Sequence, residues 1–294
     1  MRNADVYLVD GTYELFRHFY AVPPASAAAG TEVGAVRGVL GSLLRMIEQG
    51  ATHLGVATDH VIESFRNALW PGYKTGEGVQ PELLAQFAPL ERALAAMGVA
   101  VWPMVELEAD DALASAAAIC ERDAAVGRVI ICTPDKDLAQ CVRDGLVVQL
   151  DRRSGRVRDE AGVVERFGVL PASIPDYLAL VGDSADDFPG LPGFGAKTAA
   201  ALLARYGHLE AIPADGAAWD VPVRGAAKLA QTLTEQHERA RLFRDLATLR
   251  TAEPLFESVE QLRWRGPRPQ FAALSRALGA PGLHERAVAA ARSA

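Results

Sequence analysis

Nine carboxylates in the first two thirds of this 294-residue chain occur in short motifs that can hold divalent cations. Hard ions such as Mg²⁺ take carboxylate and water oxygens as ligands. Two such ions roughly 3.5–4 Å apart activate a water and stabilise the leaving oxygen in phosphodiester hydrolysis, so the set predicts a two-metal site. The acids are Asp10, Asp59, Glu108, Asp110, Asp111, Asp135, Asp137, Asp183 and Asp186.

Each acidic motif taken alone also has a purely structural interpretation. Asp10 can be a turn residue after a strand. The acids of Glu108–Asp111 and Pro134–Asp137 can open helices, where they favour the helix dipole and Thr133 supplies a cap. The structural interpretation needs a separate explanation for the acids after nearly every predicted strand. We therefore prefer a joint metal site.

The last acidic stretch, Asp183–Asp187, has the calcium loop of an EF-hand as its structural alternative. Phe188 and Phe194 stand where a calcium loop of that type needs Gly and Glu. These acids are grouped with the metal site instead.

The segment after these acids, residues 189–200, reads Pro-Gly-Leu-Pro-Gly-Phe-Gly-Ala-Lys-Thr-Ala-Ala. A glycine turn that opens a helix, with Lys197 and Thr198 in the first turn, presents backbone N–H groups and a cation to a phosphate. The segment is not a P-loop, because one residue too many separates Gly190 from Lys197 and Gly195 is not followed directly by Lys. A tight helix–hairpin connection without a ligand is the structural alternative.

Alternating strands and helices are predicted to position the acids of the first half. This alternation favours a parallel sheet covered on both faces, with its functional site beyond the carboxyl ends of the strands. The expected strands are Val6–Val9, His53–Ala57, Val99–Trp102, Val129–Cys132 and Leu146–Leu150. The expected helices are Val33–Gln49, Pro81–Met97, Asp110–Arg122 and Asp137–Arg143.

The second half is helical in pattern after a polar, turn-rich stretch at 151–162. We place a boundary near Leu170, which gives an α/β domain at 1–170 and a helical domain at 171–294. A final helix pair is expected in the tail. The expected helices of this half are Pro171–Val181, Ala196–Tyr206 and Gly225–Thr248.

The net charge of −7 is unusual for a protein that binds a polyanion, but the charge is unevenly distributed. Residues 195–294 carry 14 Lys and Arg against 10 Asp and Glu, whereas residues 1–194 carry 16 against 27. Nine of those 27 acids belong to the motifs above. Acids that hold divalent ions do not repel phosphate, because the ions dominate the local field. The net charge therefore does not exclude nucleic acid.

The remaining composition predicts a globular protein of the cytoplasm, and we expect a monomer. Cys120, Cys132 and Cys141 are odd in number and lack CxxC spacing, which is typical of buried thiols in a reducing compartment. The start of the chain has no signal-peptide pattern, and no apolar run approaches the ~20 residues that cross a bilayer.

Six motifs, in this order, resemble those of the flap endonuclease and 5′–3′ exonuclease family, which includes the nuclease domain of bacterial DNA polymerase I. The resemblance spans roughly residues 5–256. It implies a PIN-like (resolvase-like) α/β core followed by a helical domain with a helix–three-turn–helix at about 178–206. The motifs are Leu-Val-Asp-Gly with Arg17 and Tyr20, Ser-Phe-Arg at 64–66, Tyr73-Lys74, Glu-Ala-Asp-Asp at 108–111, Thr-Pro-Asp-Lys-Asp at 133–137, and Gly-Asp-x-x-Asp at 182–186 before the glycine turn.

The resemblance also implies roles for individual residues. One Mg²⁺ or Mn²⁺ would be held mainly by Asp10, Asp59, Glu108, Asp110 and Asp135. A second would lie nearer Asp137, Asp183 and Asp186, with Asp111 in support. Lys74 and Arg66 would act in catalysis with Asp10 and Asp135, by contacting the scissile phosphate and its neighbour.

Contacts with DNA follow from the same resemblance. Tyr20 would stack on an unpaired base, and the hairpin would grip duplex phosphates through Gly193, Gly195 and Lys197, with Thr198 beside them. A potassium ion would be held by the backbone carbonyls of Leu180, Val181, Pro189, Leu191 and Phe194.

One position departs from the family pattern. The family usually has an arginine three residues after the Tyr-Lys pair, where a helical arch begins, and this chain has Glu77 there between Gly76 and Gly78. Glycines weaken helix. We expect a short arch at about 74–95.

The hypothesis preferred on these grounds is a metal-dependent 5′-nuclease acting on branched, nicked or 5′-ended DNA. The alternative is a non-catalytic, structure-specific DNA-binding protein that keeps the fold, although such a protein gains nothing from acids beside phosphate. A ribonuclease of the PIN-like fold explains the hairpin less well. The altered P-loop spacing argues against an NTP-binding switch.

Overall fold

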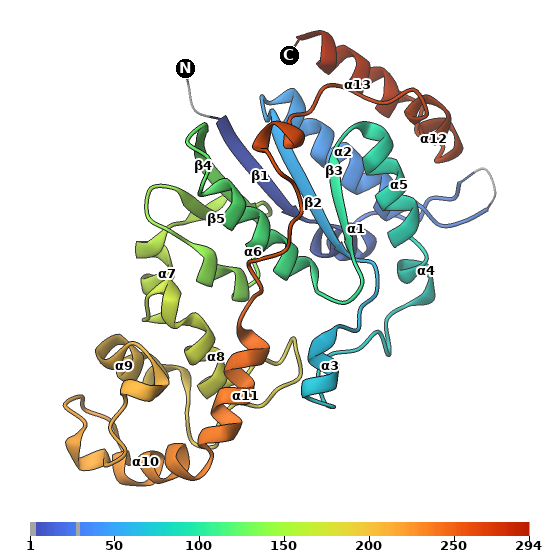
Figure 1. Ribbon diagram of the computed structural model, residues 1–294. Helices are drawn as coiled ribbons and strands as arrows, with labels where there is room; N and C mark the ends of the chain where they lie inside the picture. Colours follow the sequence, from blue (N-terminus) through green and yellow to red (C-terminus); the bar gives the residue numbers. More distant parts are fainter. Residues whose placement is uncertain (1–3, 28–29, 294) are drawn as a thin grey trace. The chain divides into compact units, whose positions relative to one another are not determined.

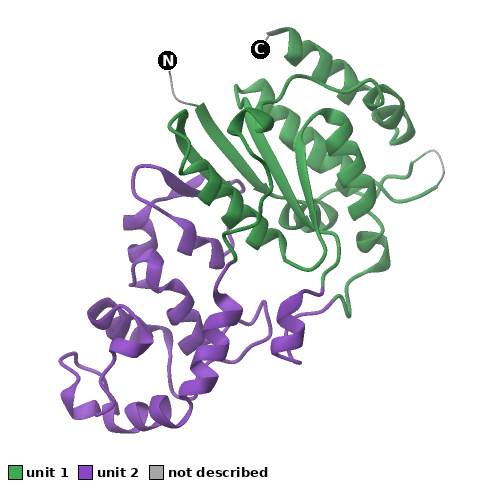
Figure 2. Cartoon of the chain, viewed as in Figure 1, with its two compact units in different colours: residues 1–62, 76–133, 250–294 green, residues 63–75, 134–249 purple. Residues whose placement is uncertain are grey.

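A computed structural model describes residues 4–27 and 30–293, and these form two compact units (Figure 2). Unit 1 contains residues 4–27, 30–62, 76–133 and 250–293, and unit 2 contains residues 63–75 and 134–249. Both units are therefore discontinuous in sequence. The division near Leu170 is one of sequence pattern and stays a prediction.

Unit 1 is built on four parallel strands, in the order β3-β2-β1-β4 (Figure 1). They are β1 (Ala4–Asp10), β2 (His53–Asp59), β3 (Ala100–Met104) and β4 (Val126–Cys132). Val9 lies beside Val56 on one side and Cys132 on the other, so the central strands end level with one another. The predicted strands and the parallel sheet are confirmed.

The helices of unit 1 cover both faces of its sheet. After β1, the chain forms α1 (Gly11–Ala21) and α2 (Gly34–Glu48) before β2, and α5 (Phe87–Met97) before β3. Helix α6 (Ala109–Cys120) then packs on β1 and β2 and leads to β4 on the other side of β1. Right-handed crossovers place α6 on the opposite face, and the change of direction between β1 and β4 is where such sheets bind ligands.

The tail of the chain returns to unit 1. Helix α12 (Phe271–Ala277) packs against α5, and α13 (Gly282–Ser293) packs against α2. A 3₁₀ turn at Val259–Leu262 precedes them. The expected final helix pair is confirmed.

The helix predicted at Pro81–Met97 is two helices, α4 (Pro81–Leu84) and α5. Proline is tolerated only in the first turn of a helix, and Pro89 becomes the third residue of α5 once that helix starts at Phe87. Gln86 fills the break, because its fully buried amide donates to the Glu82 carbonyl and accepts the Val36 N–H.

Unit 2 is mainly helical, around a core that includes Phe188 and Phe243. Helix α8 packs closely on α11. The helix predicted at Gly225–Thr248 is interrupted at Gln236, and the one predicted at Asp137–Arg143 is a short 3₁₀ turn. The helices are α3 (Phe65–Leu69), α7 (Glu160–Phe167), α8 (Ile174–Val181), α9 (Ala196–Tyr206), α10 (Ala226–Glu235) and α11 (His237–Ala247), with 3₁₀ turns at Asp137–Cys141, Pro171–Ser173, Leu209–Ala211 and Gly216–Ala218.

Unit 2 also contains a β-hairpin, of which the sequence predicts only the first strand, at Leu146–Leu150. Strand β5 (Val147–Asp151) pairs antiparallel with β6 (Arg156–Arg158). The turn between them is closed by Asp151, whose carboxylate accepts the Arg153 N–H and the Ser154 hydroxyl. Charged residues dominate 151–160, which is why the pattern of this segment indicates a polar connection instead.

Candidate metal centre

Two of the predicted acids end central strands of unit 1. Asp10 caps α1, with one carboxylate oxygen accepting the Tyr13 N–H at 2.8 Å and the other accepting the Thr133 hydroxyl at 2.9 Å. Asp59 accepts the Ala109 N–H at 2.7 Å. Backbone N–H groups and a hydroxyl thus hold these carboxylates at the carboxyl edge of the sheet.

The start of α6 supplies three more acids of unit 1. Glu108 and Asp111 form a reciprocal capping box, in which the Glu108 N–H donates to Asp111 at 3.0 Å. The other Asp111 oxygen accepts the Arg250 N–H at 2.8 Å, and Asp111 is fully buried. Its carboxylate is therefore a structural support for the motif, while Asp110 is half-buried in the first turn.

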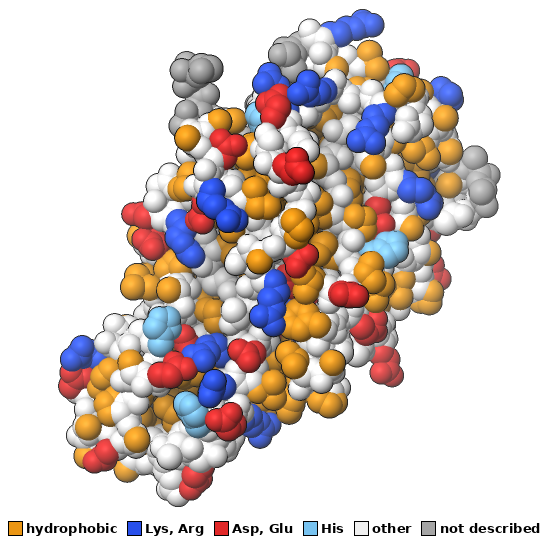
Figure 3. Space-filling view, in the orientation of Figure 1, with side chains coloured by type: hydrophobic (Ala, Val, Ile, Leu, Met, Phe, Trp, Pro, Cys, Tyr) orange, Lys and Arg blue, Asp and Glu red, His pale blue; other side chains and the backbone are white. Residues whose placement is uncertain are grey.

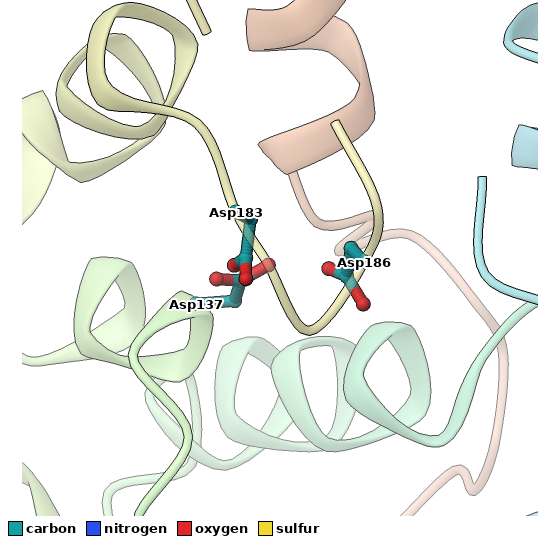
Figure 4. Close-up of side chains that lie close together, drawn as sticks. All are labelled: Asp137, Asp183 and Asp186. Carbon is teal, nitrogen blue, oxygen red and sulfur yellow. The ribbon is translucent and has the colours of Figure 1, made fainter. Parts of the chain in front are cut away.

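Unit 2 brings together a second set of acids. Carboxylate oxygens of Asp137, Asp183 and Asp186, which we call the unit 2 trio, all lie within 4.8 Å of one another, and all three residues are buried. Figure 4 shows Asp137 and Asp183 side by side, with Asp186 on the same loop as Asp183. Within the described ranges, the buried Asp137 Oδ1 has no hydrogen-bond partner. Burial, and then the charges of Asp135, Asp186 and Asp183, raise the pKa of Asp137 well above its ordinary range.

Two lysines neutralise part of the charge of the unit 2 trio. The Lys136 ammonium lies 2.6 Å from Asp183 Oδ1, and the Lys74 ammonium lies 2.8 Å from Asp186 Oδ1. Burial alone lowers the pKa of Lys136, but the hydrogen bond to Asp183 and the nearby carboxylates raise it overall. Sequence reasoning missed Lys136, although its place between two predicted ligands was a usable signal.

The loop that carries two acids of the unit 2 trio is closed on itself. Asp183 and Phe188 pair through their backbones, and Asp187 adopts a left-handed conformation with φ of 57°. The Asp187 carbonyl accepts the Trp70 indole N–H at 3.2 Å. A polar pocket of about 470 Å³ opens beside this loop, lined by Lys136, Val181, Gly182, Asp183, Ser184, Asp187, Phe188 and Pro189.

Arg66 is placed differently from Lys74. It is 1 % exposed, and its guanidinium donates to the carbonyls of Leu246 at 2.8 Å and Thr248 at 3.4 Å. A cation there stabilises the C-terminus of α11 through its unpaired carbonyls. The geometry therefore gives Arg66 a capping role, and its expected contact with phosphate stays a prediction.

The glycine turn of unit 2 depends on close backbone packing. Gly190 has φ of 68°, and a Cβ there would lie 2.3 Å from the Gly182 nitrogen. The Leu180 carbonyl accepts the Leu191 N–H at 2.9 Å, and the Leu191 carbonyl accepts the Phe194 N–H at 3.2 Å. The five carbonyls expected to hold potassium, those of Leu180, Val181, Pro189, Leu191 and Phe194, thus belong to the end of α8 and this turn.

The expected DNA contacts lie on exposed segments. Gly195 caps α9, and a Cβ added there would meet open space. Gly193 and Lys197 are exposed, while Thr198 is half-buried. Tyr20, at the end of α1 in unit 1, is 66 % exposed and packs edge-on against Phe19.

On the side drawn in Figure 3, acidic and basic side chains are interspersed with hydrophobic ones.

Cys120, Cys132 and Cys141 are all buried, and no disulfide joins them in the part of the chain that the structure describes. Burial raises the pKa of Cys120 to about 12. The interpretation of the cysteines as buried thiols is confirmed.

A doubly wound α/β unit with acids at its carboxyl edge, and a helical unit with a buried carboxylate trio, are the arrangement expected of a resolvase-like, metal-dependent nuclease. Family models agree: the N-terminal resolvase-like domain of 5′–3′ exonucleases matches residues 5–168, and the C-terminal SAM fold of 5′–3′ exonucleases matches residues 169–270. The chain belongs to the 5′–3′ exonuclease family.

Curated relatives are consistent with this assignment. The chain is 37 % identical to DNA polymerase I of Pseudomonas aeruginosa over 273 residues, which is 89 % of this chain and 29 % of the polymerase. It is 35 % identical to the 5′–3′ exonuclease of Aquifex aeolicus over 210 residues, covering 70 % of this chain and 71 % of that protein. The chain thus spans less than a third of the length of the first of these relatives.

Solved structures share the fold. A bacteriophage T5 flap endonuclease in a pseudo-enzyme-product complex with DNA and metal ions aligns over 98 % of both chains, with a TM-score of 0.62 and 19 % identity. Flap endonuclease-1 from Methanococcus jannaschii aligns over 99 % of this chain and 94 % of its own, with a TM-score of 0.60 and 14 % identity.

In residues 4–27 and 30–293, no helix is long and apolar enough to cross a membrane.

Proposed function

We propose that this protein is a metal-dependent 5′-nuclease that hydrolyses phosphodiesters in branched, nicked or 5′-ended DNA. The unit 2 trio carries the proposal, because three buried carboxylates whose oxygens lie within 4.8 Å repel one another, and the two lysines pair with Asp183 and Asp186 and not with Asp137. Asp137 Oδ1, which lacks a hydrogen-bond partner within the described residues, is an oxygen suited to a hard cation.

The proposed ligands fall into one set in each unit. In unit 1, Asp10, Asp59, Glu108 and Asp110 are assigned to one ion. In unit 2, the trio is assigned to a second ion, and Asp135 is kept as a ligand. Bound Mg²⁺ or Mn²⁺ supplies an activated water and charge stabilisation of the leaving oxygen. Potassium is proposed for the carbonyls of the glycine turn.

The remaining residues act on the substrate in this proposal. Lys74 contacts the scissile phosphate, and its backbone is held for that purpose by Asn67, whose amide donates to the Lys74 carbonyl at 3.0 Å. The exposed start of α9 offers backbone N–H groups and Lys197 to duplex phosphates. Tyr20 offers an exposed ring to an unpaired base.

The names of relatives support the same proposal, since a 5′–3′ exonuclease and several DNA polymerases I are among them. On this basis we also propose a role in DNA replication and repair. The sequence patterns are the basis for three further proposals: a monomeric state, a cytoplasmic location and the functional division of 1–170 from 171–294. A non-catalytic DNA-binding protein remains the second candidate. Its one supporting observation is that the two lysines already pair with the acids of unit 2.

One assay separates the two candidates. End-labelled flap, nicked and blunt duplexes are incubated with the protein in Mg²⁺, in Mn²⁺ and in EDTA, and the cut positions are mapped. We expect cleavage near the 5′ end or branch only with a divalent ion. Cleavage in excess EDTA rejects the metal mechanism, and binding without cleavage in both ions favours the second candidate.

A first prediction concerns Asp183. Asp183→Asn removes one charge from the unit 2 trio and should abolish turnover, because a neutral amide holds a divalent ion poorly. DNA binding should be unchanged or tighter, since repulsion of phosphate is reduced. The Asp215→Asn variant, changed at an exposed turn, is the matched control. Full activity of Asp183→Asn in single-turnover assays would remove Asp183 from the ligand set.

A further inference from the structure

A buried polar pair in the β5–β6 hairpin connects to the loop of the predicted metal ligand Asp135. Gln149 of β5 and Arg158 of β6 lie directly opposite each other in the antiparallel register. The Arg158 guanidinium donates to the Gln149 side-chain oxygen, and the Gln149 amide donates to the backbone carbonyl of Asp135. The three groups therefore form a continuous relay within unit 2.

The relay continues to the carboxylate of Asp135 and the backbone of Asp137. Asp135 Oδ1 accepts the Asp137 N–H at 3.0 Å. Both oxygens of Asp135 on this path, the carbonyl and Oδ1, are thereby fixed by hydrogen bonds. A shift of the carbonyl would change the direction in which the residues of this loop project, so the hairpin is placed where it can set the loop geometry.

Burying the side chains of Gln149 and Arg158 in the hairpin costs solvation free energy. Gln149 is fully buried and Arg158 is 4 % exposed, and the same-face neighbour Val147 is also fully buried. Burial, and then the positive charges of Arg166 and Arg156, lower the pKa of Arg158. Two apolar residues at this cross-strand position would pack without the cost of removing an amide and a guanidinium from water.

We infer that Gln149 and Arg158 are positioning residues for the metal centre, and that they act by holding the carbonyl of Asp135 so that its loop presents its carboxylates to a divalent ion. This inference rests on the proposed function. Groups that orient metal ligands through hydrogen bonds change metal affinity or activity by about 10–100-fold when removed. Arg158 acts one step further away, because it fixes the Gln149 amide so that its N–H₂ group points at the carbonyl.

The double variant Gln149→Leu/Arg158→Leu tests the inference in the full chain. It replaces the polar pair by an apolar one of similar size, so the hairpin should remain folded. The melting temperature of the protein should fall only modestly, because the Asp135 carbonyl loses a donor while the apolar pair avoids the cost of burying an amide and a guanidinium. Mn²⁺ binding, measured by titration calorimetry without DNA, should weaken about tenfold or more, and single-turnover cleavage should slow by a similar factor. Arg156→Leu removes an exposed arginine from the same strand and should change neither quantity.

Gln149→Glu is a second variant that keeps a partner for Arg158. It replaces the amide donor by a carboxylate oxygen that faces the Asp135 carbonyl. The added negative charge alone favours Mn²⁺, so weaker Mn²⁺ binding in this variant indicates that the Asp135 loop has moved because the amide donor is gone and the new oxygen repels the carbonyl. We expect a severalfold loss, and unchanged or tighter binding would overturn the inference.

The outcomes also separate this inference from the proposed function. If the unaltered protein neither binds Mn²⁺ nor cleaves DNA, the proposed function fails. If it does both, and the double variant matches it in Mn²⁺ affinity and in rate, the metal site stands and the positioning role is rejected. Loss of Mn²⁺ affinity in both variants, with Arg156→Leu unchanged, supports the role of the hairpin.

Discussion

At the scale of single residues, the carboxylates of this chain are held by donors that come from distant positions in the sequence. Thr133, which directly follows β4, is fully buried, and its hydroxyl donates to the Asp10 carboxylate over a distance of 2.9 Å. Asp111 receives the N–H of Arg250, which lies 139 positions further along the chain. Hydrogen bonds to charged groups are stronger than neutral ones, so these donors fix the acids and also stabilise the fold.

The Thr133 hydroxyl gives the residue-scale prediction. Thr133→Val keeps the shape of the side chain but leaves Asp10 without this donor, which should lower the free energy of unfolding by about 1.5–3 kcal/mol. Urea denaturation measures the loss. Thr133→Ser retains the hydroxyl and serves as the control, with most of the stability preserved. Equal midpoints for Thr133→Val and the unaltered protein would mean that water replaces the hydroxyl at no cost.

At the scale of elements, the glycine turn shows how backbone packing shapes the surface that is proposed to bind duplex phosphates. Gly182 ends α8 with φ of 82°, and Gly190 returns the chain against it. Both positions face backbone atoms, whereas the Gly195 position faces open space. Gly182 and Gly190 are therefore needed to form the turn, and Gly195 leaves room at the start of α9 for a ligand.

Gly190→Ala and Gly195→Ala should consequently differ in their effects. Gly190→Ala forces a Cβ to within 2.3 Å of the Gly182 nitrogen at a positive φ, so the turn must shift. Both the stability of the protein and its binding to duplex DNA should therefore decrease. The loss of stability should be at least about 1–3 kcal/mol, the range for strained backbone. Gly195→Ala should fold normally and weaken binding only through its added methyl group. Melting temperatures and duplex titrations compare the two, and equal stability would refute the packing argument.

At the scale of the whole molecule, patterns in the sequence predict the parallel sheet because buried strands are continuous apolar runs that end in acids, as at Val6–Val9 before Asp10. They do not predict the break before Phe87, which depends on the place of Pro89, or strand β6, whose residues are charged. The sequence pattern also does not predict the hydrogen bond of Arg66, because its acceptor, the Leu246 carbonyl, lies 180 positions away. Contacts between residues far apart in the sequence form only when the chain folds, so the local spacing of residues does not predict them.

The charge of the whole molecule leads to the last prediction. The net charge of −7 opposes DNA binding at low ionic strength, but charges beyond a Debye length of ~8 Å are screened at physiological salt. The proposed affinity for DNA must therefore come from local contacts. Lys197, exposed in the first turn of α9, is the cation proposed to meet duplex phosphate there.

Lys197→Ala should weaken duplex binding regardless of sequence and reduce the salt slope of the binding constant by about one phosphate contact. Lys228→Ala, changed at an exposed position of α10, removes the same charge from unit 2 and should leave the slope almost unaltered. Titration of one duplex at several KCl concentrations measures both slopes. If the two variants lose equal slope, the effect is one of net charge alone and the start of α9 is not a phosphate site. If only Lys197→Ala loses it, the binding of this acidic chain to a polyanion is local, because the rest of the charge is too far from the phosphates to matter.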